Sequence, residues 1–500
     1  MSPSLYPVNV SFLQELMATV AEQGRALLPK ALFAANGEDI VALAKALASG
    51  RGEASGVAIA RQILACYQQL DTAGKRAFFE FLGREMQPDA EAAAEAAAAY
   101  AETPGPETLS RLQHAVESPR QEFFRRLNLA PGATQGIVAM RRDLLEIGEG
   151  DPVLALVDGD LKHLFHSWFN RGFLVLRRID WQTPAAILEK IIAYEAVHAI
   201  ESWDDLRRRL DPKDRRCFAF FHPSLIDEPL IFVEVALTHE ISDAVQPLLT
   251  APPKDEAIEA PTTAVFYSIS NCQDGLKGIS FGHFLIKQVV EDLVRELPTL
   301  KTFVTLSPVP GFAQWLAGAD GRAVVASLSE EERNAAGLVK RPRWHTKERA
   351  TQAVRDPLLA LAAHYFLAAK RRDGKPLDAV ARFHLGNGAR LERINFLADV
   401  SDKGLAQAHG VMVNYRYDLK EIEKNHEAYA NQKAVAASRA VRSLLKTADA
   451  VAAKPAGGAE AKAQEGPASS GKGAVSIASR AALLAIEATG RAGSGKRRDG

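Results

Sequence analysis

Residues 263–310 read TAVFYSISNCQDGLKGISFGHFLIKQVVEDLVRELPTLKTFVTLSPVP. The segment begins with β-branched and aromatic residues that are typical of a buried strand. A loop with three glycines follows, and apolar residues then recur at three- and four-residue spacing over 284–297, as in an amphipathic helix. A second apolar run, KTFVTL, precedes the turn SPVP. The order strand, glycine-bearing loop, helix and strand predicts a mixed α/β unit.

The glycine-bearing loop, with Gly275, Gly278 and Gly282, presents backbone N–H groups just before a helix start. Such groups at the positive end of a helix bind phosphate or pyrophosphate well. The spacing fits neither the G-x-G-x-x-G fingerprint nor a P-loop. An ordinary tight turn between strand and helix therefore explains the glycines equally well.

The sequence on either side indicates an α+β fold class with two domains and a tail. Residues 10–168 contain successive helical patterns separated by Gly- and Pro-rich breaks, whereas short Val-, Ile-, Phe- and Tyr-rich runs begin near 169. One later helix is expected to begin with Asp356 as N-cap and Pro357 at the first helical position. We predict a helical domain (1–168), a mixed α/β domain (169–430) and an Ala/Gly/Lys-rich disordered tail (431–500).

Composition excludes several classes of protein. The chain has 500 residues, with 61 Lys plus Arg against 61 Asp plus Glu, so a broad polyanion-binding surface such as a nucleic-acid binder needs is not expected. No apolar run reaches the ~18 residues of a membrane helix, and three cysteines suit a reducing compartment. We expect a cytoplasmic protein with no nucleic-acid or membrane partner.

Four blocks in fixed order point to a known family: QDGLKGISFGHFLIKQVVEDL, LSPVPGFAQWL, FHLGNGARLERINFLADVSDKG and MVNYRYDL. With the helical first domain, they make the chain resemble the malonyl-CoA decarboxylases over roughly residues 10–430. The resemblance implies a catalytic domain similar to the GNAT acetyltransferases, malonyl-CoA as substrate, and acetyl-CoA and CO2 as products. It also implies a homo-oligomer, a tetramer built from dimers.

The resemblance assigns roles to individual residues. It implies that Ser307 and His384 are catalytic and that Tyr417 lines the pocket without an assigned chemical role. The residues implied to bind CoA are Lys277, Gly278, Ile279, Ser280, Phe281, Gly282, His283 and Ile286. No cofactor or metal is expected, because the thioester carbonyl of malonyl-CoA is itself an electron sink. From residue type alone, Ser307 is typical of a turn, and His384 of a structural histidine after an apolar strand.

The residue types fit decarboxylation through an enolate. Fixed hydrogen-bond donors must stabilise the enolate oxygen, and a side chain must supply a proton. We hypothesise that His384 protonates the enolate while Ser307 orients the carboxylate and exchanges protons with it. A CoA-dependent acyltransferase on the same scaffold and a non-catalytic CoA-binding protein are the alternatives.

Other candidates are weaker. His163 and His166 lie three apart on a predicted helix but lack a third ligand motif, so an exposed pair is favoured over a metal site. Cys272 is interpreted as a small residue at a strand end. The segment Gly490–Lys496 lacks the Ser or Thr of a P-loop. The basic segment 340–349 is interpreted as a solvated loop or, alternatively, as a contact for the phosphates of CoA.

Overall fold

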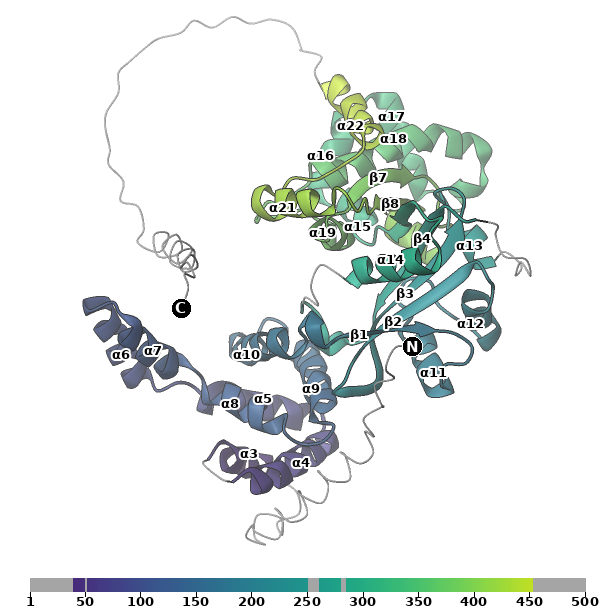
Figure 1. Cartoon of the computed structure of the whole chain (residues 1–500). Helices are drawn as coiled ribbons and strands as arrows, with labels where there is room; N and C mark the ends of the chain where they lie inside the picture. The colour runs from purple at the N-terminus through teal and green to yellow at the C-terminus, as the bar shows by residue number, and fades with distance from the viewer. Residues whose placement is uncertain (1–38, 50–51, 251–259, 280–284, 453–500) are drawn as a thin grey trace, which may run out of the picture. The chain divides into compact units, whose positions relative to one another are not determined.

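The computed structural model describes residues 39–49, 52–250, 260–279 and 285–452. The described part of residues 39–168, here called the helical region, is helical, as predicted (Figure 1). Its core is built around fully buried aromatic side chains, among them Phe78, Phe123, Phe124 and Phe165. Its helices are α3 (Ile40–Ala48), α4 (Glu53–Gln69), α5 (Thr72–Glu85), α6 (Ala90–Glu102), α7 (Pro106–Val116), α8 (Pro119–Leu127), α9 (Ala133–Ile147) and α10 (Pro152–Trp168).

The region after residue 168 is built on an eight-stranded sheet in the order β1-β2-β3-β4-β5-β8-β6, with β7 paired to β8. Among the strand pairs that the structure describes, β4 and β5 are parallel and the others are antiparallel. The predicted α+β class is therefore confirmed. The strands are β1 (Val175–Ile179), β2 (Arg215–His222), β3 (Leu225–Thr238), β4 (Thr263–Asn271), β5 (Thr302–Thr305), β6 (Ser307–Pro308), β7 (Arg390–Asn395) and β8 (Met412–Arg416).

Helix α14 (Leu285–Glu296) connects the two parallel strands, as a parallel pair requires a crossover. Strands β4 and β5 stay in register from Thr263↔Thr302 to Phe266↔Thr305 and then separate. The register between β3 and β4 shifts at the same point, because Val235 of β3 pairs with Phe266 whereas Glu234 pairs with Ser268. Beyond it β4 continues along β3, whereas the chain after β5 turns into β6 and pairs with β8. A gap therefore opens between β4 and β6.

Further helices cover the sheet and connect its strands (Figure 1). Within the described ranges, every helix is too short or too polar to cross a lipid bilayer. The α-helices are α11 (Ala185–Tyr194), α12 (Trp203–Leu210), α13 (Gln246–Thr250), α15 (Phe312–Ala317), α16 (Ala319–Ser327), α17 (Glu330–Gly337), α18 (Glu348–Leu367), α19 (Ala379–Gly386), α20 (Asp402–Ala408), α21 (Ile422–Gln432) and α22 (Arg439–Ala452). The short 3₁₀ turns are η1 (Arg171–Phe173), η2 (Asp274–Leu276), η3 (Leu338–Lys340) and η4 (Trp344–Thr346).

Two expectations from the sequence are wrong. Helix α18 begins at Glu348, so Pro357 lies inside it and Asp356 is not its N-cap. The apolar residues of α18 are deeply buried, and their burial offsets the one backbone hydrogen bond that proline cannot donate. The chain also stays ordered beyond 430: α22 follows α21, and Val441 is 1 % exposed. The rest of the predicted tail, 453–500, lies outside the described residues.

Arg141 of α9 joins the helical region to the glycine-bearing loop. Its guanidinium is fully buried and donates to the carbonyls of Gly275 (2.6 Å) and Lys277 (3.0 Å), while its Nε pairs with Asp158 (2.7 Å). The approach is so close that a Cβ on Gly275 would lie 1.9 Å from the carbonyl oxygen of Val138. Glycine at 275 is therefore required by packing against α9.

Replacing Arg141 tests this connection. Arg141→Met leaves the carbonyls of Gly275 and Lys277 without this donor, and it leaves Asp158 with Lys162 as its remaining partner, so we expect a loss of about 2–4 kcal/mol in the free energy of unfolding. The neighbouring Arg142→Met removes a half-exposed ion pair with Asp143 and should cost about 0–1 kcal/mol. Urea denaturation of both variants measures the difference. Equal losses would contradict the proposed role of Arg141.

Candidate active site

Ser307 and His384, 77 residues apart in the chain, meet in the structure. Ser307 opens β6 at the point where the sheet separates, and it is 5 % exposed. His384 is 2 % exposed and lies within α19, so the expectation that it follows a strand is wrong. The run AVARFHLG follows helical periodicity, and Asp378 caps this helix by accepting from the backbone N–H of Ala381 at 2.7 Å.

The imidazole of His384 has partners on three sides. Its Nε2 lies 3.1 Å from Oγ of Ser307, and its Nδ1 lies 2.7 Å from the hydroxyl of Tyr417. The ring of Tyr415 stacks on it, with centroids 4.5 Å apart and planes 23° from parallel. Tyr417, predicted only to line the pocket, therefore contacts the imidazole directly.

Burial sets the protonation of this cluster. Desolvation lowers the pKa of His384 to about 3, and burial raises the pKa of Tyr417 well above its usual value. Near neutral pH the imidazole is therefore uncharged and the phenol is protonated. A neutral imidazole carries one N–H, so one ring nitrogen donates a hydrogen bond and the other accepts one.

A cavity of about 250 Å³ lies in the gap between β4 and β6. Its walls are mostly apolar, and none of its lining residues carries a full charge at neutral pH. Its polar lining residues are Ser307 and His384 on one side and Tyr267 and Asn271 of β4 on the other. The lining residues are Val197, Phe266, Tyr267, Ile269, Asn271, Leu306, Ser307, Pro308, Ala379, Val380, Phe383 and His384.

Backbone groups of β4 also face this gap. The N–H of Cys272 donates to Leu230 of the neighbouring β3 chain, and the register is regular from Ser268 to Asn271. Because backbone direction alternates along an antiparallel strand, the N–H of Ile269 points away from β3 and toward the gap. The cavity therefore has a backbone donor opposite Ser307.

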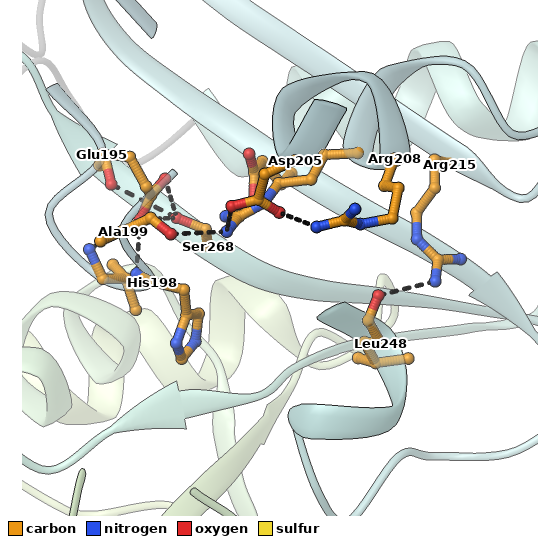
Figure 2. Close-up of polar contacts among 12 residues, drawn as sticks. Glu195, His198, Ala199, Asp205, Arg208, Arg215, Leu248 and Ser268 are labelled. Carbon is orange, nitrogen blue, oxygen red and sulfur yellow. Dashed lines mark hydrogen bonds and ion pairs between the residues drawn. The ribbon is translucent and has the colours of Figure 1, made fainter. Parts of the chain in front are cut away.

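The wall formed by residues 195–199 is held by side chains of other elements (Figure 2). The carboxylate of Glu195 accepts from the backbone N–H groups of Val197 (2.7 Å) and His198 (2.8 Å) and from the hydroxyl of Ser268 (2.8 Å). Lys403 of α20 donates to the carbonyls of residues 196 and 197, and Arg209 to that of residue 199. Val197 is thereby fixed between this cavity and a second one of about 160 Å³.

The predicted CoA-binding residues are partly described. Lys277 is exposed, Gly278 has φ of +80°, and Ile279 is 7 % exposed. Ile286, at 2 % exposure, lies in the first turn of α14. The remaining four, Ser280, Phe281, Gly282 and His283, lie outside the described residues.

The weaker candidates lie elsewhere. His163 and His166 are exposed on α10. Cys272 is buried at the end of β4, and burial raises the pKa of its thiol well above the usual value, which does not favour a nucleophile. The basic residues of segment 340–349 are exposed. In the part of the chain that the structure describes, no cluster of three or more His, Cys, Asp or Glu side chains is arranged to hold a metal.

Sequence reasoning missed Thr305, Tyr415 and Val197. Thr305 lies two residues before Ser307, and this spacing places both side chains on one face of an extended chain. That signal was available in the sequence. The stacking of Tyr415 and the position of Val197 depend on contacts between elements far apart in the chain, and no local pattern indicates them.

Comparison with protein families gives two matches that cover most of the chain. The malonyl-CoA decarboxylase C-terminal domain matches residues 172–454, and the malonyl-CoA decarboxylase N-terminal domain matches residues 86–169. Among curated proteins, the chain is similar to "Malonyl-CoA decarboxylase, mitochondrial" of Mus musculus, with 39% identity over 360 residues. That alignment covers 67% of this chain and 73% of the mouse protein.

Solved structures that are similar to this chain are also malonyl-CoA decarboxylases. The malonyl-CoA decarboxylase of Rhodopseudomonas palustris has a TM-score of 0.76 and 53% sequence identity, and that of Agrobacterium vitis has a TM-score of 0.76 and 54% identity. Each comparison covers 81% of this chain and 99% of the other. The similarity therefore includes both the helical region and the sheet.

The buried His384 predicts a pH dependence of stability. Its folded pKa of about 3 lies below the value of ~6.5 for an unfolded chain, so the unfolded state takes up the proton first as the pH falls. From about pH 6.5 to about pH 3, wild type should lose roughly 1.4 kcal/mol per pH unit relative to His384→Asn. Chemical denaturation at a series of pH values measures this, with the exposed His166→Asn as control. Parallel curves for wild type and His384→Asn would contradict it.

Proposed function

The chain belongs to the malonyl-CoA decarboxylase family, whose reaction converts malonyl-CoA to acetyl-CoA and CO2, and we propose that Ser307 and His384 carry out this reaction here. The observation that carries the proposal is the 3.1 Å contact between Ser307 and a neutral, buried His384 at a cavity without charged lining. The chain is accordingly a carboxy-lyase.

The cavity favours loss of the carboxylate. A malonyl carboxylate placed beside Ser307 exchanges water for one hydroxyl, one imidazole and apolar walls, and it meets no cation among the lining residues. An anion in such surroundings is destabilised, and its departure as neutral CO2 relieves that cost. A lysine or arginine in the same place would bind the substrate better and retain the carboxylate.

The electron pair of the breaking carbon–carbon bond moves into the thioester, whose carbonyl oxygen becomes an enolate oxygen. A backbone N–H positioned in advance stabilises such an oxygen most strongly in a cavity that excludes water. We assign this role to the N–H of Ile269, which faces the gap opposite Ser307. The thioester is the electron sink, so the proposed route uses no metal or organic cofactor.

His384 supplies the proton that completes the reaction. The bound carboxylate is an opposite charge beside the imidazole, and it raises the pKa of His384 above its value in the empty site. The imidazole stays uncharged while the carboxylate is in place, and His384 takes up a proton from solvent as CO2 leaves and passes it to the α-carbon. The balance is malonyl-CoA plus one proton giving acetyl-CoA plus CO2. Ser307 orients the carboxylate, and the hydroxyl of Tyr417 fixes the orientation of the imidazole by its hydrogen bond with Nδ1 of His384.

The CoA moiety is proposed to bind at the loop that follows β4. Lys277, Gly278 and Ile279 border it, and Ile286 lies in the first turn of the helix that follows. The supporting observation is that Arg141 fixes the carbonyls of Gly275 and Lys277, so the start of the loop is rigid. A rigid loop loses little conformational entropy on binding.

Alanine and asparagine variants test the catalytic assignment. Ser307→Ala and His384→Asn should each lower kcat for acetyl-CoA formation by roughly 10²–10⁴, with little change in cooperative unfolding near pH 8. Purified protein is incubated with malonyl-CoA and no added acceptor, and acetyl-CoA and CO2 are both quantified. Wild-type turnover in both variants would refute the assignment. Product formation only with an added amine would favour the acyltransferase alternative.

The chain is further proposed to form a homo-oligomer, a tetramer built from dimers. Helix α7 has no buried residue, and its Leu109 and Val116 are 40% and 51% exposed. Apolar side chains exposed together are typical of an interaction surface. Light scattering should give a multiple of the chain mass, and Leu109→Glu with Val116→Glu should lower it. A monomeric mass for wild type would contradict the proposal. Cytoplasmic location stays a prediction.

A further inference from the structure

Thr305 fixes the direction of a hydrogen bond next to His384. Oγ of Ser307 donates to Oγ1 of Thr305 across 2.8 Å, and the backbone N–H of Tyr415 donates to the same oxygen across 3.1 Å. Thr305 is fully buried in β5, so water does not reach its hydroxyl. A serine hydroxyl has one proton. That proton is directed to Thr305 and is therefore not directed to His384.

The rest of the chain of hydrogen bonds follows from this first one. With its proton committed to Thr305, Ser307 can only accept from Nε2 of His384, 3.1 Å away. The neutral imidazole then carries its single proton on Nε2, and Nδ1 accepts from the hydroxyl of Tyr417 at 2.7 Å. All three contacts are satisfied by one direction, from Tyr417 through His384 and Ser307 to Thr305.

This direction is opposite to that in an enzyme with a nucleophilic serine. There the serine hydroxyl donates to the imidazole, which removes its proton as a general base when the oxygen attacks. A site that binds thioesters gains from avoiding such an attack. Oγ of Ser307 would bond to the thioester carbon, its proton would pass to Nε2, and the carbon–sulfur bond would break. CoA would leave with that proton, and water would then release the acyl group from the serine.

We propose that Thr305 is a positioning residue that keeps Ser307 a hydrogen-bond acceptor, so that the Ser307–His384 pair delivers protons and does not hydrolyse the thioester. The inference rests on the catalytic roles proposed for Ser307 and His384. It concerns the direction of the protons before substrate binds: a carboxylate beside Ser307 takes the place of Thr305 as acceptor of the hydroxyl proton, and in both states Ser307 accepts from His384 and does not donate to it.

The variant that removes the acceptor is Thr305→Val, and Thr305→Ser is its matched control because it keeps the hydroxyl. The first readout is labelling of Ser307 by a fluorophosphonate, measured by intact mass. In that reaction the Oγ–phosphorus bond forms, fluoride leaves and His384 takes the proton. We expect Thr305→Val to label on the order of tenfold faster than wild type, Thr305→Ser at the wild-type rate, and Thr305→Val with Ser307→Ala not at all.

The second readout is the fate of malonyl-CoA. In Thr305→Val the release of free CoA thiol should rise relative to acetyl-CoA formation, whereas Thr305→Ser should keep the wild-type ratio. A folded Thr305→Val with wild-type labelling and product ratio would overturn the proposal, and so would slower decarboxylation without faster labelling. A role confined to packing would not change this ratio.

A measurement on wild type does not depend on the folding of any variant. Nitrogen-15 NMR of labelled histidine, with the His384 signals identified by their loss in His384→Asn, reports which ring nitrogen carries the proton. The proposal requires protonated Nε2 and accepting Nδ1, and the opposite tautomer would overturn it. This result is independent of turnover. Unimpaired catalysis in Ser307→Ala and His384→Asn would refute the proposed function without changing the tautomer.

Discussion

The imidazole of His384 is held without charge between Ser307, Tyr417 and the ring of Tyr415, and the chemistry of the site depends on this burial. Desolvation keeps the empty site neutral, although the substrate is an anion. An approaching carboxylate therefore meets a base that is ready to accept a proton, and no cation in the cavity that would retain the charge. In the proposed mechanism, the same low polarity destabilises the carboxylate and keeps the imidazole uncharged until the enolate requires a proton.

The backbone supplies the space for this arrangement. Strands β4 and β5 separate after Phe266 and Thr305, and the separation places Ser307 at one side of a gap and a strand with backbone donors at the other. Helix α19 closes the gap with His384, and the segment 195–199 closes it with Val197. Hydrogen bonds to buried carboxylates fix both walls. Asp378 caps α19 by accepting from the backbone N–H of Ala381, and Glu195 accepts from the backbone N–H groups of Val197 and His198. The cavity is therefore preformed.

The class of fold was predictable from the sequence, and so was the choice of Ser307 and His384, which the structure brings together, whereas most of the cavity was not. Local periodicity marked the helices and the unit from β4 to β5, and the four blocks carried Ser307 and His384. The sequence misplaced the start of α18 at Pro357, because burial of the helix outweighs the local preference of proline. It also placed the end of the folded chain too early, because the composition averaged over residues 431–500 concealed the buried Val441. Val197 and Tyr415 act through contacts distant in sequence, and only the three-dimensional structure brings them together.

The contact of Arg141 with the loop after β4 has a thermodynamic consequence. The helical region holds part of the loop by which the substrate is expected to bind, through the carbonyls of Gly275 and Lys277. A ligand that stabilises this loop must therefore also stabilise the helix that carries Arg141, since binding to the native state shifts the unfolding equilibrium of everything coupled to it. Substitutions of Phe78 or Phe123 that allow this helix to open locally would then weaken substrate affinity, although both side chains belong to the helical core and not to the loop.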